Sequence, residues 1–129
     1  MNYSALTRRY FDAAVNAGVL TGADIFRGAA GSRAQGTWVQ FDVQVNSGII
    51  RAARFLAFAC PHTIAVSAWT AENAVGGPAR AALPESVQAL SERFAVPAPK
   101  LGRLLIVEDA WLATMQAAAA AIAGQHGTL

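Results

Sequence analysis

Cys60 is the residue best suited to chemistry, because it is the only cysteine and stands where an apolar strand-like run meets a helix-like pattern. A thiol at a helix N-terminus faces free backbone N–H groups and the positive end of the helix dipole, which lower its pKa. The resulting thiolate is both a metal ligand and a nucleophile. Pro61 follows directly and suits the first helical position. The same pattern is also typical of an unreactive cysteine that packs as a small apolar side chain.

His62 is a candidate second donor, two residues after Cys60. Its position in the first helical turn predicts a surface residue. A nucleophilic-cysteine enzyme needs a base and an orienting third group, and the sequence indicates no such group for Cys60. Phosphate-binding, dinucleotide-binding, nucleophile-elbow, zinc-protease and paired-cysteine motifs are absent. We therefore expect a protein that is not an enzyme.

The composition predicts one compact domain over residues 1–129, since 54% of the residues are hydrophobic and the chain has no room for a second core. No run of about 18 strictly apolar residues occurs, so we expect no membrane-spanning helix. The charges near the N-terminus are not followed by an apolar core, and one cysteine cannot form an internal disulfide. These features favour a cytoplasmic protein.

The charge distribution argues against nucleic-acid binding. The net charge is +2, and the basic residues are spread along the chain without forming a block. Nucleic-acid binding usually requires a concentrated basic face with stacking aromatic residues. We therefore expect neither a nucleic acid nor a membrane as partner.

The first half of the chain predicts a helix followed by a small sheet. Val39, Phe41 and Val43 alternate with polar residues, as in a half-buried strand. The expected elements are a helix over 3–15 capped by Ser4, a weak edge strand over 23–26, a flexible loop ending at 31–36, a strand over 39–45, a turn over 46–48 and a strand over 49–59.

The second half predicts helices that cover one face of that sheet. In order they are a helix from Cys60 to Val75 closed by Gly76, a short helix over 84–94, a stiff extended linker over 96–100, a last helix over 101–122 ending at Gly124, and a loose tail over 125–129. Trp69 is expected to pack in the core. The fold class is therefore α+β, with a small three-stranded antiparallel sheet and helices packed on one face.

Several segments match a known family and together extend over nearly the whole chain. They are Tyr10–Gly18, Gly31–Gly36, Val43–Ile50, Arg54–Cys60, Ile64–Ser67, Glu72–Gly76 and Lys100–Ala110. With the order of elements, they make the chain resemble the IscU-type, or NifU N-terminal-type, iron–sulfur cluster assembly scaffolds. The resemblance implies that fold and a role in iron and iron–sulfur cluster binding.

The resemblance also marks the positions of a ligand set that this chain has lost in part. Such scaffolds carry one cysteine at the strand-to-helix corner, and here it is Cys60. In the family's Ala-Cys-Gly-Asp loop, Gln35 replaces the cysteine and Thr37 the aspartate. In the Lys-X-His-Cys segment that opens the last helix, Gly102 replaces the histidine and Arg103 the cysteine. The resemblance therefore implies a degenerate cluster site.

One thiolate does not complete a cluster site, because iron–sulfur clusters need about four ligands, mostly thiolates. A homodimer that pairs Cys60, with His62, across a two-fold axis is one way to supply them, and a partner protein or small thiols are another. If the fold matches, Arg103 lies near Cys60, lowers the pKa of its thiol and favours acceptance of persulfide sulfur from a cysteine desulfurase. Alternatively, Arg103 only pairs with a nearby acid.

Three functions follow from the resemblance. The first is a cluster assembly scaffold or accessory protein whose ligands are incomplete. The second is a non-catalytic interaction module that has lost cluster binding, and the third is a single-cysteine sulfur acceptor. Partners implied by the family are a cysteine desulfurase and a chaperone, the latter through the proline-rich segment Val96–Lys100, which resembles the family's chaperone-recognised segment. A plain linker is the other interpretation of that segment.

Overall fold

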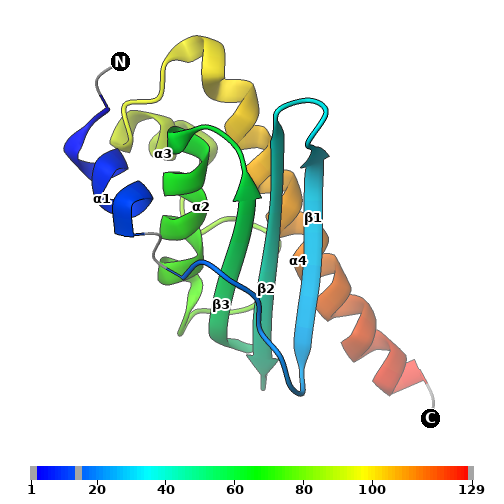
Figure 1. The fold of residues 1–129 in the computed structure, drawn as a ribbon. Coiled ribbons are helices and arrows are strands. Elements are labelled where there is room, and N and C mark those ends of the chain that lie inside the picture. Colours follow the sequence, from blue (N-terminus) through cyan, green and yellow to red (C-terminus); the bar gives the residue numbers. More distant parts are fainter. Residues whose placement is uncertain (1–2, 14–15, 128–129) are drawn as a thin grey trace.

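The computed structural model describes residues 3–13 and 16–127 as an α+β fold with one three-stranded antiparallel sheet. The elements are α1 (Ala5–Ala13), β1 (Ile25–Ser32), β2 (Thr37–Asn46), β3 (Ile49–Phe58), α2 (Pro61–Ala74), α3 (Val87–Arg93), the short 3-10 helix η1 (Ala98–Lys100) and α4 (Leu101–Gly127). Figure 1 shows α4 running behind the sheet, diagonally to the strands. The predicted fold class is confirmed.

β2 is the central strand, and its alternation is the one that the sequence predicts. Val39, Phe41 and Val43 are fully buried and belong to the core that the helices cover. The β2–β3 hairpin turns at Ser47 and Gly48, which both have left-handed backbone angles (φ 54° and 75°). Two successive positive φ values match the twist of the flanking strands, so the predicted tight turn is confirmed.

β1 is longer than predicted. In place of a weak strand over 23–26 and a flexible loop, it pairs with β2 from Ile25 to Ser32. Gly28 does not interrupt the strand, and α4 packs closely against the sheet at this residue. A Cβ built on Gly28 would lie 2.3 Å from the backbone nitrogen of Thr114. This glycine therefore permits close packing rather than flexibility.

Two helices begin where a side chain caps them. α1 follows Ser4, whose Oγ accepts a hydrogen bond from the Thr7 N–H at 3.1 Å, so the predicted cap is confirmed. The predicted end of this helix at residue 15 lies outside the described residues. α3 begins three residues later than predicted, because Ser86 caps it by accepting from the Ala89 N–H at 3.1 Å.

The C-terminal prediction is wrong in two places. The second half of the expected extended linker forms η1, which the Lys100 N–H closes by donating to the Pro97 carbonyl at 2.8 Å. α4 continues to Gly127, beyond its expected end near Gly124, so residues 125–127 are helical rather than part of a loose tail. The alanine-rich sequence favours this continuation, since alanine has the highest helix propensity.

The core lies between the sheet and α2 and α4. Trp69 is 6% exposed, as expected of a core residue. The rings of Phe41 and Trp111 meet edge to face, with centroids 5.3 Å apart, and join β2 to α4.

Residues Ala98–Ala121 are long and apolar enough to cross a membrane by length and composition alone. Of that window, 39% is buried inside the fold, and the buried side chains include Leu104, Val107 and Trp111. The core helix of a globular domain has the same character. Packing against the sheet therefore accounts for the apolar face of α4, and the expected lack of a membrane span stays a prediction.

The opposite face of the sheet is crossed near its lower end by the segment before β1 (Figure 1). Asp42 anchors this segment, since its carboxylate accepts the Leu20 N–H at 2.9 Å and two hydrogen bonds from Arg27 at 2.7 and 2.8 Å. The Asp42 side chain is only 1% exposed. Burial raises the pKa of Asp42, but the hydrogen bonds from Arg27 and Leu20 outweigh it and hold the pKa below its ordinary value.

We expect Gly28→Ala to destabilise the fold by about 1 to 3 kcal/mol, because the new methyl group would overlap the backbone of α4 at Thr114. Urea unfolding measures the loss. Gly102→Ala is the control: nothing lies within 4 Å of a Cβ built there, so it should cause no loss and a gain of up to about 1 kcal/mol. Equal stability of Gly28→Ala and wild type would show that α4 does not approach β1 so closely.

We expect stability to fall in acid as Asp42 takes up a proton. Because its folded pKa lies below the ordinary value of 3.8, the carboxylate stabilises the fold above that pH. This stabilisation is lost as the pH falls through the folded pKa. Urea midpoints measured between about pH 2 and pH 7 should therefore drop more steeply for wild type than for Asp42→Asn. Parallel curves would contradict the assignment to this residue.

Candidate functional site

The candidate site is the corner at which β3 ends and α2 begins. Cys60 is the N-cap of α2, with extended backbone angles (φ −74°, ψ 163°), and Pro61 occupies the first turn, as predicted. The thiol is half-buried, and its Sγ lies 3.4 Å from Thr63 Oγ1. Cys60 therefore occupies the position in which the helix N-terminus stabilises a thiolate.

The pKa of Cys60 is lowered from its ordinary value by its neighbours. Burial alone raises it, but hydrogen bonds from the Thr63 hydroxyl and N–H, followed by a hydrogen bond from Arg103 and its positive charge, outweigh that effect. The predicted proximity of Arg103 to Cys60 is thus found. Thr63 is the residue that sequence reasoning missed, although a threonine three positions after a helix cap is a signal that could have identified it.

His62 is buried, and its predicted place on the surface is wrong. It is 3% exposed, and its ring packs edge-on against Tyr3, with centroids 4.8 Å apart. Tyr3, which precedes α1, packs over it, a contact between residues far apart in the chain. Burial, and then the positive charges of Lys100 and Arg103, lower the pKa of His62, so the imidazole is neutral at physiological pH.

The Nδ1 atom of His62 is buried and has no hydrogen-bond partner in the described part of the chain. A neutral imidazole nitrogen is a donor type that suits iron and zinc. His62 therefore remains a candidate second donor, now as a buried residue.

The other predicted site positions lie at the same end of the sheet. Trp38, at the start of β2, pairs with Phe58, at the end of β3, so the β1–β2 turn is at the Cys60 end. Gln35 is exposed in that turn, and Thr37 is 4% exposed at the start of β2. Among the described residues, no hydrogen bond joins either of them to Cys60.

The donors do not form a complete metal site within one chain. In residues 3–13 and 16–127, no group of three or more His, Cys, Asp or Glu side chains could hold a metal ion. A cluster needs about four ligands, and this corner provides one thiol and one imidazole. The residues present therefore fit only part of a cluster site.

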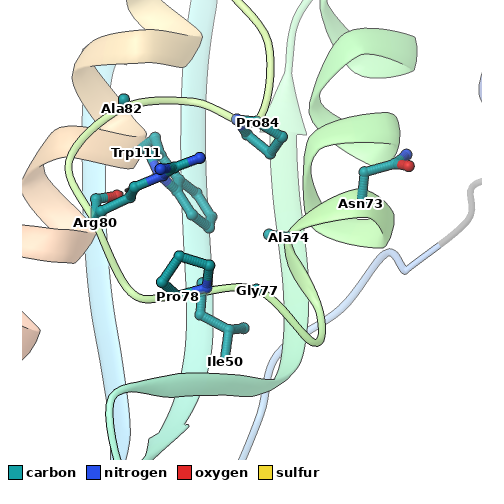
Figure 2. Close-up of a pocket in the computed structure, with 9 residues that line it drawn as sticks. All are labelled: Ile50, Asn73, Ala74, Gly77, Pro78, Arg80, Ala82, Pro84 and Trp111. Carbon is teal, nitrogen blue, oxygen red and sulfur yellow. Dashed lines mark hydrogen bonds between the residues drawn. The ribbon is translucent and has the colours of Figure 1, made fainter.

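A separate cavity lies at the other end of the sheet. Figure 2 shows the loop after α2 curving around it, with Pro78 and Pro84 on the loop and Trp111 on α4. The Trp111 Nε1–H donates to the Arg80 carbonyl at 3.2 Å and ties the loop to the helix. The cavity volume is about 130 Å³, below the roughly 300 to 1,000 Å³ of ligand pockets. Its contacts secure the loop and do not indicate a substrate site.

Comparisons with known proteins agree on the fold. The family model described as "NifU-like N terminal domain" matches residues 2–123. A candidate iron–sulfur cluster assembly scaffold protein for the SUF system from Fervidobacterium islandicum has a similar structure, with TM-score 0.68 and 13% identity over 90% of this chain and 96% of that one. A nitrogen-fixing NifU-like protein (N-terminal) from Brucella abortus has TM-score 0.61 and 18% identity over 98% and 95% of the chains. A search of curated protein sequences found no match.

We expect iodoacetamide to alkylate Cys60 of the folded protein faster at neutral pH than that of the denatured protein, because the lowered pKa increases the thiolate fraction. Arg103→Gln should slow the reaction at pH 7 and move its pH midpoint upward, since the cation is lost. Mass spectrometry follows the modification. A folded thiol that resists alkylation at neutral pH, yet titrates normally after denaturation, would show that Cys60 is inert.

Proposed function

The chain belongs to the family of NifU-like N-terminal domains, and from this premise we propose that it acts in iron–sulfur cluster assembly as a scaffold-type or accessory protein. The observation that carries the proposal is the Cys60 corner. There, a half-buried thiol at the start of α2 is next to Thr63 and Arg103, and its pKa is lowered. Cys60 is therefore the residue that we assign to the chemistry.

The iron–sulfur cluster would be the cargo of such a scaffold, and its ligand site in this chain is degenerate. The cluster ligands are therefore shared with other molecules rather than supplied by one chain. Cys60 supplies one thiolate, and His62 is the second donor at the corner. A cluster that needs about four ligands is then held by two copies of the chain, or with ligands from a partner or from small thiols. Gln35 and Thr37 are weak donors for soft metal sites and contribute less.

Sulfur acceptance is a second candidate function, which the position of Arg103 favours. The Cys60 thiolate attacks the outer sulfur of a donor cysteine persulfide. A new S–S bond forms at Cys60 as the donor's S–S bond breaks, and the donor leaves as a thiolate. No external oxidant or reductant is required. Arg103 favours this step by stabilising the anionic sulfur of Cys60 before and after transfer.

The partners that we propose follow from the family. A cysteine desulfurase is the sulfur source, and a chaperone binds the segment that contains Pro97 and Pro99, both of which are exposed. We further propose a cytoplasmic protein without enzymatic turnover. The lack of enzymatic turnover is supported by the contact of the thiol. Within α2, the described side chain that hydrogen-bonds to Cys60 Sγ is Thr63 and not His62.

We expect anaerobic reconstitution with iron, sulfide and reductant to give the visible absorption of an iron–sulfur cluster in wild type and not in Cys60→Ser, because the only thiol has been removed. The iron-to-protein ratio and acid-labile sulfide should be below one cluster per chain. Colourless wild-type protein would contradict the scaffold role. Sulfur acceptance and partner binding would then remain as functions. Detection of labelled persulfide on Cys60 distinguishes the first from the second.

A variant that gains ligands provides a second test, and a matched double variant is its control. Gln35→Cys combined with Arg103→Cys restores thiols at the two positions that the family resemblance identifies. We expect this double variant to bind several-fold more iron and sulfide per chain than wild type, and Gln116→Cys with Leu112→Cys, on the exposed face of α4, to bind no more. Equal loading of the two double variants would show that these positions do not converge on Cys60.

A further inference from the structure

The face of the sheet opposite the helices carries an exposed aromatic patch at the Cys60 end. Directly paired residues lie on the same face, so the register places Trp38 beside Phe58 and Gln40 beside Leu56. The aromatic patch consists of Ala29, Arg33, Trp38, Leu56 and Phe58.

The patch lies outside the part of that face that the segment before β1 covers. Phe58 is 51% exposed and Leu56 36%. The segment before β1 covers the neighbouring rows, where Arg54 Nη1 donates to the Ala17 carbonyl and Leu20 binds Asp42. Figure 1 shows this segment crossing only the lower part of the sheet. Exposed apolar side chains that lie together on a sheet are typical of an interaction surface.

Arg33 gives the patch a fixed positive charge. Its guanidinium carbon lies 5.8 Å from the centroid of the Trp38 ring and 5.9 Å from that of Phe58. Stacking on two rings holds the cation in place, so little side-chain entropy is lost when it binds an acid. The acid nearest to the patch in the sheet, Asp42, is buried and already paired with Arg27.

We propose that the aromatic patch docks the protein that delivers sulfur to Cys60, and that this donor presents apolar and acidic side chains to it. The inference rests on the proposed function, because it requires Cys60 to accept sulfur. Phe58 precedes Cys60 by two residues, which is about 7 Å of extended chain. A protein that covers the patch therefore reaches the thiol.

The charge of the patch favours a sulfur-donor protein over two other partners, a second copy of the chain and a nucleic acid. A second copy of the chain would bring Arg33 toward a like charge across a two-fold axis. A nucleic acid needs several cations along its backbone, but Arg33 is the one cation in the patch, since Arg27 is paired with Asp42 and Arg54 donates to the Ala17 carbonyl. An acidic protein surface satisfies both the cation and the aromatic side chains.

The test compares two sulfur donors with wild type and with Phe58→Ala, Leu56→Ala and Arg33→Glu. One donor is a cysteine desulfurase supplied with labelled cysteine, and the other is glutathione persulfide. We expect the patch variants to accept sulfur from the desulfurase about tenfold more slowly at subsaturating protein. Their rates with glutathione persulfide should equal that of wild type, because the corner is unchanged. Mass spectrometry of Cys60 measures both rates.

Leu112→Ala is the matched control, since Leu112 is 37% exposed on α4 and Leu56 is 36% exposed. It should react with both donors like wild type. The desulfurase rate should also fall with ionic strength in wild type, and less so in Arg33→Gln.

The outcomes separate the docking inference from the function on which it rests. If wild-type Cys60 accepts sulfur from neither donor, sulfur acceptance itself is overturned. If it accepts sulfur and the patch variants match wild type with the desulfurase, the docking surface is overturned. The docking surface is also overturned if the variants change only the sedimentation of the protein, which would assign the patch to a second copy. It is likewise overturned if they change only binding to a fluorescent oligonucleotide, which would assign the patch to a nucleic acid.

Discussion

The close approach of α4 to the sheet at Gly28 is the contact on which the site depends. Because Gly28 has no side chain, its strand lies against the backbone of α4 at Thr114, and a Cβ there would overlap it. This contact sets the depth of the helix behind β1. The helix then begins at the Cys60 end of the sheet, where Arg103 lowers the pKa of the thiol. Packing in the middle of the fold thus determines the electrostatics at its edge.

At that edge, Arg103 lies near Cys60, at a position where the family resemblance implies a thiolate. Arg103 attracts the anionic form of Cys60 sulfur and repels metal cations, while Thr63 donates hydrogen bonds to the same sulfur. On the proposed function, a single chain favours bound sulfur over bound iron, since a cluster requires further ligands. The fold is that of the family, and the ligand set that the resemblance implies is reduced to a thiol in a positive environment.

The two faces of the sheet have separate roles. Helices α2 and α4 cover one face and form the core. The other face is covered only in part, because Asp42 anchors the segment before β1 at Leu20, away from the aromatic patch. The same carboxylate binds Arg27 and so pairs the charge of that cation, whose side chain stays 51% exposed. The ion pair thus helps to determine which part of the sheet stays exposed beside Cys60.

Local patterns in the sequence determined much of the fold. The alternation around Phe41, the turn at Gly48 and the cap at Ser4 depend on residues a few positions apart, and each was predictable. The position of Cys60 at the start of a helix was predictable for the same reason, and family resemblance indicated Arg103 as its neighbour.

Only the tertiary structure decided the length of β1, the burial of His62 and the exposure of Phe58. β1 extends past Gly28 because α4 packs against it, and His62 is buried because Tyr3 packs on its ring. Phe58 stays exposed because the segment that covers the lower sheet ends before reaching it. Each outcome depends on contacts between residues far apart in the chain, and no periodicity or spacing within a single segment encodes such contacts.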